Sequence, residues 1–326
     1  MLIDSFGRVH DYLRISLTDH CNLRCQYCMP NEDIEFMPTS NLMSVAEIEK
    51  LAKIFVELGI KKIRLTGGEP LVRKDFTEII EKLSCLPIEL TLTSNGILIH
   101  KHIETLQKAN VKTLNISLDS LKPEVFFAIT RRNAFEQVWN NILLLLENGF
   151  RLKINVVALN NIVENELLDF VALTKNLPLH IRFIEWMPFK GNQWSSRKVV
   201  TALQMLQMIQ QEYDFIKLKD APNETAKKYQ VIGYQGTFAF ITTMSEHFCG
   251  NCNRLRLTAD GKIKNCLFGK DELDLLSPLR LSTPILDIIE KSIQQKHAFL
   301  GGQLQSNYQK NTPENIENRS MIAIGG

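Results

Sequence analysis

The chain has 326 residues, a formal net charge of +2 and 44% hydrophobic residues, as is ordinary for a soluble globular protein with a sizeable core. A charge so close to zero gives no general basic field for nucleic acid or for a membrane surface, so any anion site has to be local. Its longest apolar runs are too short to cross a bilayer, and the first residues lack the pattern of a secretion signal. The expected location is the cytoplasm, where seven cysteines indicate metal binding or catalysis rather than disulfides.

Strand-like and helical patterns alternate along the first 183 residues. Apolar, β-branched runs predict six strands, at Tyr12–Leu17, Lys62–Thr66, Leu90–Thr93, Thr113–Leu118, Lys153–Leu159 and His180–Phe183. Helices are predicted between them, at Ser44–Leu58, Phe76–Leu83, Ile103–Ala109, Ala134–Asn148 and Glu164–Thr174. Strands joined by helical crossovers pair in parallel, which predicts an α/β fold, either a partial or full barrel or an open doubly wound sheet. Functional groups are expected at the carboxyl ends of the strands.

The pattern changes after about Trp194, which divides the chain into a βα core (1–193) and a smaller C-terminal region (194–326). This region is expected to hold a helix at Thr201–Glu212, a hairpin with strands at Arg254–Thr258 and Lys262–Cys266, and a last helix at Pro284–Lys296. The polar segment from Gly301 to Gly326 is expected to be an extended tail with a frayed end.

Cys21, Cys25 and Cys28 form a C-x3-C-x2-C motif in the loop directly after the first predicted strand. Thiolates at this spacing can converge on one metal centre, and three ligands suit a four-iron cluster with one iron left open for a substrate or cofactor. A structural zinc site that borrows His20 is the alternative, but zinc usually takes C-x2-C pairs and four closed positions. The spacing therefore favours an iron–sulfur cluster.

Cys249, Cys252 and Cys266 form a second motif, C-x2-C-x13-C, on the predicted hairpin. Zinc is an equal alternative here, because C-x2-C followed by a later ligand is a common zinc pattern and His247 could supply the fourth position. Spacing alone does not choose between zinc and a second cluster. The seventh cysteine, Cys85, follows a predicted apolar helix and is expected to be a buried small hydrophobic residue.

The segment Thr66–Pro70, with the sequence Thr-Gly-Gly-Glu-Pro, ends the second predicted strand. Its glycines allow a ligand to approach the backbone, and its carboxylate can accept from an ammonium group. Basic residues recur near the same rim, and the hairpin adds two that point the same way; together they are Arg14, Arg64, Lys153, Arg182, Arg254 and Arg256. Arginine binds phosphate through bidentate hydrogen bonds, so the set predicts a site for a small, multiply phosphorylated molecule.

The motifs at Cys21–Cys28 and Thr66–Pro70 resemble the radical SAM superfamily, which uses S-adenosylmethionine (SAM). A fuller set of segments resembles one family within it, the GTP 3′,8-cyclases (molybdenum cofactor biosynthesis protein A). That set covers nearly the whole chain, at 6–8, 12–16, 115–119, 182–185, 249–256 and 324–326. His20 and Ser94 depart from the family pattern, which usually has an arginine and a threonine at these positions.

The resemblance implies a partial (β/α)6 barrel of the TIM type with a [4Fe-4S] cluster at each end of the active cavity. It implies that the first cysteine triad holds the cluster that binds SAM, and that Cys249, Cys252 and Cys266 hold the second cluster. The implied SAM contacts are Tyr27, Gly68, Ser117 and Met187. The implied GTP contacts are Arg14, Arg64, Thr93, Lys153, Arg182, Arg254, Leu255 and Arg256. The implied catalytic residues are Arg256, Gly325 and Gly326, the glycines because the tail would enter the active site.

The implied reaction converts GTP to (8S)-3′,8-cyclo-7,8-dihydroguanosine 5′-triphosphate, an early step of molybdenum cofactor biosynthesis. A radical from SAM would remove hydrogen from the ribose C3′, which then attacks C8 of the guanine. The family also implies an electron donor of the flavodoxin or ferredoxin type, handover to cyclic pyranopterin monophosphate synthase, and a homodimer.

Two other functions fit parts of the sequence. Peptide-modifying radical SAM enzymes also carry auxiliary clusters, but they tend to have longer C-terminal extensions with more cysteines. A barrel with a structural zinc ribbon that binds nucleic acid is disfavoured by the near-neutral charge and the few aromatic residues of the C-terminal region.

Overall fold

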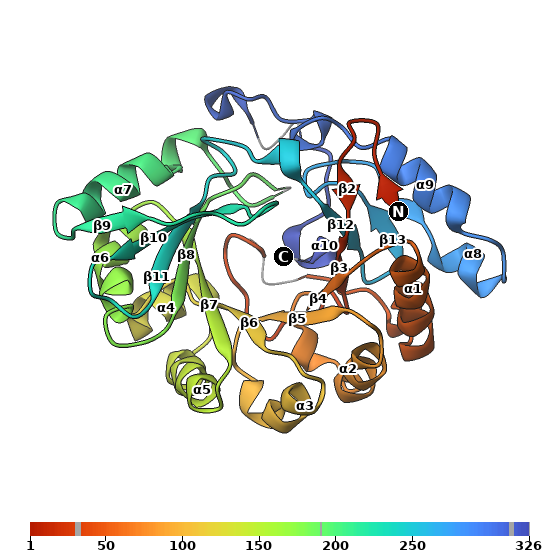
Figure 1. Ribbon diagram of the computed structural model, residues 1–326, viewed down its shortest axis with the longest axis horizontal. Helices are drawn as coiled ribbons and strands as arrows, with labels where there is room; N and C mark the ends of the chain where they lie inside the picture. Colours follow the sequence, from red (N-terminus) through yellow and green to blue (C-terminus); the bar gives the residue numbers. More distant parts are fainter. Residues whose placement is uncertain (30–33, 190, 313–315, 326) are drawn as a thin grey trace.

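The computed structural model describes residues 1–29, 34–189, 191–312 and 316–325. All six predicted core strands are present, as β3 (Tyr12–Ser16), β4 (Lys62–Thr66), β5 (Glu89–Ser94), β6 (Thr113–Ser117), β7 (Arg151–Ala158) and β8 (His180–Glu185). They pair in parallel in chain order, and the sheet curves around a central space (Figure 1). The predicted α/β partial barrel is therefore confirmed.

Helices cover the outer side of this curved sheet (Figure 1). They are α1 (Val45–Glu57), α2 (Phe76–Ser84), α3 (Ile103–Lys108), α4 (Pro123–Thr130), α5 (Phe135–Glu147) and α6 (Val163–Leu173). The α1 helix begins at the predicted capping box, because Ser44 accepts from the backbone N–H of Glu47 and the Glu47 carboxylate accepts from that of Ser44. Of these helices, α4 was not predicted from the sequence.

Strands of the C-terminal region extend the same sheet at both edges. These strands are β9 (Phe215–Lys217), β10 (Ala226–Val231), β11 (Thr237–Ile241), β12 (Arg254–Leu257), β13 (Lys262–Lys264) and β14 (Leu273–Asp274). β12 pairs in parallel with β3, and β11 pairs in parallel with β8. The full order is β14-β13-β12-β3-β4-β5-β6-β7-β8-β11-β10-β9, so the sheet is open, with β14 and β9 at its edges. The predicted hairpin is present as β12 and β13, and β1 (Leu2–Ile3) with β2 (Val9–His10) forms a separate ribbon.

The remaining helices are α7 (Ala202–Gln210), α8 (Leu276–Arg280), α9 (Leu286–Gln294) and α10 (Met321–Ile324). α10 lies inside the curve of the sheet (Figure 1), so the prediction of an extended, frayed tail is wrong for its described part. Four apolar side chains in the described part of the tail are buried, those of Leu304, Ile316, Ile322 and Ile324, and Arg319 binds Asp260 and Glu272. None of the described helices is long and apolar enough to cross a membrane.

Candidate active site

The two cysteine motifs lie at opposite ends of the barrel. The first motif follows the carboxyl end of β3. Cys252 precedes the amino end of β12, which runs parallel to β3 and places Arg254 beside Tyr12. Because parallel strands share their direction, the two triads flank the cavity from its two ends.

The first cysteine triad lines one cavity together with residues from the strand ends. The cavity wall includes all four residues that the sequence analysis assigned to SAM, namely Tyr27, Gly68, Ser117 and Met187. Burial, with the Glu69 carboxylate nearby, raises the pKa of Cys21 to about 11, and burial also raises the pKa values of Cys25 and Cys28. Binding a metal centre would remove these protons, because thiolates rather than thiols are metal ligands.

The Gly-Gly turn packs directly against the cysteine loop. A Cβ on Gly68 would lie 2.4 Å from the carbonyl oxygens of both Asp19 and His20, a distance that excludes any side chain. Beside it, the buried Glu69 carboxylate accepts from the backbone N–H of Asn95 (2.7 Å) and from Ser94 Oγ (2.9 Å). Ser94, a departure from the family pattern, therefore still supplies a hydroxyl donor.

Asp119 supports the Tyr27 side chain in the same cavity. Its carboxylate accepts from the Tyr27 hydroxyl (2.6 Å) and from the backbone N–H of Val157 (2.8 Å). Burial raises the pKa of Asp119 to about 6, although these two hydrogen bonds oppose the rise.

The second cysteine triad lines a smaller cavity with Arg254, Arg256 and Asn265. β12 and β13 pair in an antiparallel hairpin in which Arg256 lies opposite Lys264. Cys266, two residues after Lys264, therefore lies near Arg254 at the start of β12, and so near Cys252. Two cations contact one thiol: Arg254 Nη2 and Lys296 Nζ both lie 3.6 Å from Cys252 Sγ. Burial alone would raise the pKa of Cys252, but Arg254 and Lys296 lower it to about 6.

Among the described residues, no three His, Cys, Asp or Glu side chains lie close enough together to hold a single metal ion. A four-iron cluster needs a different arrangement, because each cysteine binds its own iron. Buried thiols around a cavity, with a backbone cradle at Gly68 that admits no side chain, fit such a cluster and SAM.

A row of cationic side chains lines the concave face of the sheet between the two cysteine sites. Arg14 and Arg64 are register partners on β3 and β4, and Arg256 is the partner of Arg14 on β12. The alternate residues of these strands, such as Leu13 and Ile63, are fully buried in the main core, so the cations face the cavity. None of the six predicted cations (Arg14, Arg64, Lys153, Arg182, Arg254 and Arg256) forms an ion pair with a described carboxylate.

The charges of this row act on one another. Burial and the neighbouring Arg64 and Arg14 lower the pKa of Arg182 to about 9, and burial and Arg182 lower the pKa of Lys153 to about 8. Burial would raise the pKa of Tyr12, but Arg64 and Arg14 lower it to about 7. A bound polyanion would relieve this repulsion.

Several buried polar atoms in the same region have no hydrogen-bond partner within the protein. They are Arg14 Nε, Asn115 Oδ1, His180 Nε2 and Arg182 Nε. Such atoms are rare in folded proteins because burial without a partner is unfavourable. Their gathering on β3, β6 and β8 indicates a polar ligand in the barrel.

The described end of the tail enters this site. Arg256 Nη1 donates to the carbonyl oxygens of Gly325 and Ile324, and Met321 and Ile322 line the first cavity. Gly325 has a φ of 73°, and a Cβ there would lie 2.4 Å from Thr66 Oγ1. Gly326 lies outside the described residues.

The predicted site residues divide between the two cavities and the strands between them. Tyr27, Gly68, Thr93, Ser117 and Met187 line the first cavity, and Arg254 and Arg256 line the second. Arg14, Arg64, Lys153 and Arg182 line neither cavity and lie on the concave face of the sheet, whereas Leu255 faces the other way. Leu255 is fully buried in the main core, on the opposite face of β12 from Arg254 and Arg256, because side chains alternate along a strand. Its side chain cannot contact a ligand in the barrel.

The prediction that Cys85 is buried is wrong. This residue is exposed because it follows the end of α2 and lies off the buried stripe of Phe76, Ile79, Ile80 and Leu83.

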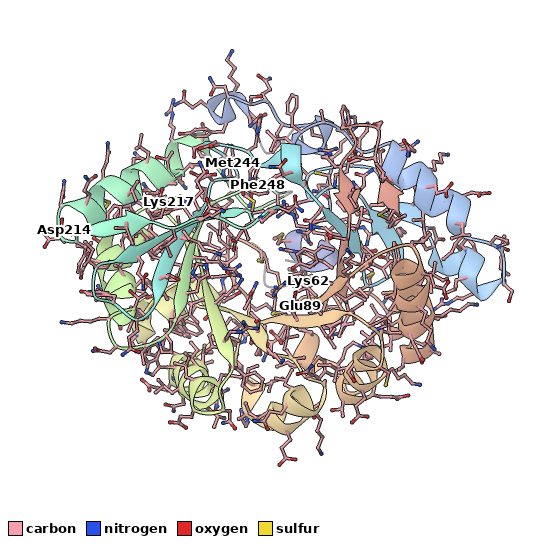
Figure 2. The ribbon with its side chains drawn as sticks, viewed as in Figure 1. Lys62, Glu89, Asp214, Lys217, Met244 and Phe248 are labelled. Carbon is pink, nitrogen blue, oxygen red and sulfur yellow. The ribbon has the colours of Figure 1, made fainter. Side chains whose placement is uncertain are left out.

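Four residues of the site were missed from the sequence: Tyr12, Lys62, Asn115 and His180. Lys62 lies two residues before Arg64 on the same face of β4, and its Nζ lies 2.8 Å from Glu89 Oε1 (Figure 2). That two-residue spacing was the available signal. For Asn115 and His180 no sequence signal existed, because neutral polar residues in strands are common.

Comparisons with known proteins agree with this geometry. Residues 15–174 match the family model of the radical SAM superfamily, and residues 179–300 match that of Molybdenum Cofactor Synthesis C. By fold, Streptococcus suis SuiB bound to S-adenosylmethionine is similar, with a TM-score of 0.62 and 15% identity, over 89% of this chain and 68% of that one. At this identity the likeness shows the fold alone.

Several relatives are similar along nearly the whole chain. The mitochondrial GTP 3′,8-cyclase of Arabidopsis thaliana is 45% identical, over 100% of this chain and 84% of its own length. The GTP 3′,8-cyclase of Desulforamulus reducens is 43% identical, over 90% of this chain and 94% of its own length. Human molybdenum cofactor biosynthesis protein 1 is 47% identical over 96% of this chain, but the chain spans about half the length of this and some other relatives. The chain therefore belongs to the GTP 3′,8-cyclase family of radical SAM proteins, which use SAM and two [4Fe-4S] clusters.

Proposed function

We propose that this protein converts GTP to (8S)-3′,8-cyclo-7,8-dihydroguanosine 5′-triphosphate. The observation that carries the proposal is the row of cations without carboxylate partners between the two cysteine sites. A triphosphate supplies the negative charge that this row lacks, and GTP also offers donors and acceptors for the unpartnered atoms of Asn115 and His180.

The residues divide into three groups by role. Cys21, Cys25 and Cys28 would hold the first cluster, with SAM against Tyr27, Gly68, Ser117 and Met187. The cations Arg14, Arg64, Lys153, Arg182 and Arg254, with Thr93, would hold the triphosphate and ribose. Cys249, Cys252 and Cys266 would hold the second cluster near the guanine.

The first cluster, held by Cys21, Cys25 and Cys28, and SAM, held in the cavity that contains Tyr27 and Gly68, would supply the radical chemistry needed to remove hydrogen from C3′ of the ribose. The protein's own contribution is positioning and exclusion of water. Arg256 holds the backbone of Gly325 over the cavity, so the tail closes the site while its carbonyl groups stay paired. Asp119 holds the Tyr27 hydroxyl and thereby fixes one wall of the SAM pocket.

The first test counts iron and sulfide. Wild-type protein and a Cys249→Ala/Cys252→Ala/Cys266→Ala variant are purified and reconstituted without oxygen. We expect roughly eight irons in the wild type and about four in the variant. About four irons and one zinc in the wild type would contradict the proposal, because the C-terminal site would then be structural.

The second test follows the hydrogen atom. GTP with deuterium at C3′ is incubated with SAM and a reductant, and the 5′-deoxyadenosine formed is analysed by mass spectrometry. The proposed reaction places deuterium in 5′-deoxyadenosine and forms cyclised nucleotide in equal amount. Cleavage of SAM without deuterium transfer would point to another substrate, such as a peptide.

The proposal includes partners that follow from the family rather than from particular residues. They are a cytoplasmic one-electron donor of the flavodoxin or ferredoxin type and cyclic pyranopterin monophosphate synthase as the next enzyme. Pull-down of each by the loaded protein, with and without SAM and GTP, is the direct check.

A further inference from the structure

Lys296 lies just beyond α9, and its side chain is buried against the second cysteine site. The residue is 3% exposed. Its Nζ donates to the carbonyl oxygens of Asn265 (2.7 Å) and Arg254 (3.0 Å) and lies 3.6 Å from Cys252 Sγ. A lysine buried this far is normally paired with a carboxylate.

No described carboxylate lies within ion-pairing distance of Lys296. Arg8 and Arg254 instead add positive charge around the ammonium, and the Asp4 carboxylate binds Arg8 and His10. The acidic group in contact with the ammonium is the Cys252 thiol, whose Sγ lies 3.6 Å from Nζ. The negative partner of Lys296 is therefore the cysteine site itself.

The same ammonium joins the two segments that carry these cysteines. Its carbonyl acceptors belong to Arg254, two residues after Cys252, and to Asn265, the residue before Cys266. Asn265 in turn donates from Nδ2 to the carbonyl oxygen of Ser292 on α9 (2.6 Å). Lys296 thus fixes both sides of the hairpin's open end to one helix.

We propose that Lys296 is a positioning residue for the second cluster, donating a hydrogen bond to the Cys252 sulfur and stabilising the reduced form of the cluster. The proposal rests on the proposed function, because it needs a redox-active cluster at this triad. Hydrogen bonds to cluster sulfurs and nearby positive charge raise a reduction potential, since the reduced cluster is more negative.

The test compares Lys296→Met, which keeps the length of the side chain and removes its charge, with Lys296→Arg, which keeps the charge. Lys291→Met is the matched control, because Lys291 is an exposed lysine on α9. Each protein is reconstituted without oxygen, its iron and sulfide are counted, and the midpoint potential of each cluster is measured by EPR-monitored titration. Thermal unfolding of the metal-free proteins checks that each is folded.

We expect Lys296→Met either to keep about eight irons, with a lower potential at the second cluster only, or to lose about four of them from that site. Lys296→Arg should restore the wild-type behaviour, and Lys291→Met should match it. The first cluster serves as the internal reference.

Unchanged iron and potential in Lys296→Met would overturn the role of Lys296 while leaving the cyclase intact. A packing role would be shown instead if Lys296→Arg did not restore the wild-type iron content and potential. The same conclusion would follow if the metal-free Lys296→Met protein did not fold. A wild type with only about four irons would overturn the second cluster, and with it both proposals.

Discussion

Lys153 lies on the concave face of β7, where the charges of Arg182, Arg64 and Lys62 act against its ammonium form and the Glu224 carboxylate favours it. Burial and Arg182 lower its pKa to about 8. Below that pH the ammonium attracts phosphate, and above it the neutral amine does not. The affinity for a triphosphate should therefore fall as the pH rises through 8.

We predict that the dissociation constant of GTP rises by about tenfold between pH 7 and pH 9, as expected for loss of one required proton with a pKa near 8. Lys153→Met should bind GTP more weakly at pH 7 and show a flatter dependence. Equilibrium binding measured across this range checks it, with Lys175→Met as an exposed-lysine control. The comparison also separates the effect of Lys153 on the pH dependence from that of Tyr12, whose pKa is about 7. The prediction would be contradicted if the dissociation constant depended on pH equally steeply in the wild type and in Lys153→Met.

At the scale of single residues, the site residues that could be predicted from the sequence were those with a charged side chain or a regular spacing. The neutral polar residues of the site could not be predicted. The cysteines and the strand arginines were identified because their side chains are rare in such positions. Asn115 and His180 differ from ordinary strand residues only by lacking a partner, which three-dimensional structure alone reveals. Leu255 was included on the family resemblance, although alternation along the strand places its side chain on the opposite face from Arg254 and Arg256.

At the scale of elements, contact between the Gly-Gly turn and the cysteine loop gives a sharp prediction. Gly68→Ala would place a methyl group 2.4 Å from two loop carbonyl oxygens, so the loop has to move. We expect roughly half of the iron to be lost, all from the first site. Gly250→Ala is the control, because Gly250 lies in the second cysteine loop and a Cβ there would meet nothing within 4 Å; this variant should keep all its iron. A full iron content in Gly68→Ala would contradict the prediction, because the first cysteine loop would then have moved without losing its cluster.

The tail gives a second prediction at this scale. Gly325→Ala should reduce product formation by about tenfold or more, a loss of about 1.4 kcal/mol of transition-state stabilisation, because the methyl group would displace the tail from Thr66 and Ser16. Gly149→Ala is the matched control, since Gly149 has a φ of 75° with open space around it. The measurement is the steady-state rate of product formation, with the iron content of each variant as a check. An equal loss of rate in Gly325→Ala and Gly149→Ala would show that backbone strain alone causes the effect.

The tail also shows why elements were predicted unevenly. The core strands and the capped helix α1 carry their signals locally, in alternation and in the Ser44–Glu47 box. The last segment is polar along most of its length, and its burial depends on isolated isoleucines and on Arg319 meeting acids about 50 residues earlier. Such long-range pairing leaves no periodic pattern to read.

At the scale of the whole molecule, the two segments that match separate family models share one sheet and one main core. We therefore predict a single cooperative unfolding transition for the metal-free protein. Urea unfolding would be followed in two variants with one tryptophan each, Trp139 beside the first segment's strands or Trp194 in the second. Coinciding midpoints are expected, and an earlier transition at Trp194 would show that the C-terminal region unfolds by itself.

Arg8 donates to the carbonyl oxygen of Cys249, 241 residues later in the chain, and β3 pairs with β12 across a similar separation. During synthesis the first strand and its cysteine loop therefore emerge long before the strand that covers their edge. At about 5–20 residues per second, the wait is roughly 10 to 50 seconds. In that interval the edge of β3 that later pairs with β12 has no partner strand, so the backbone groups along it stay unpaired until the C-terminal region has been made.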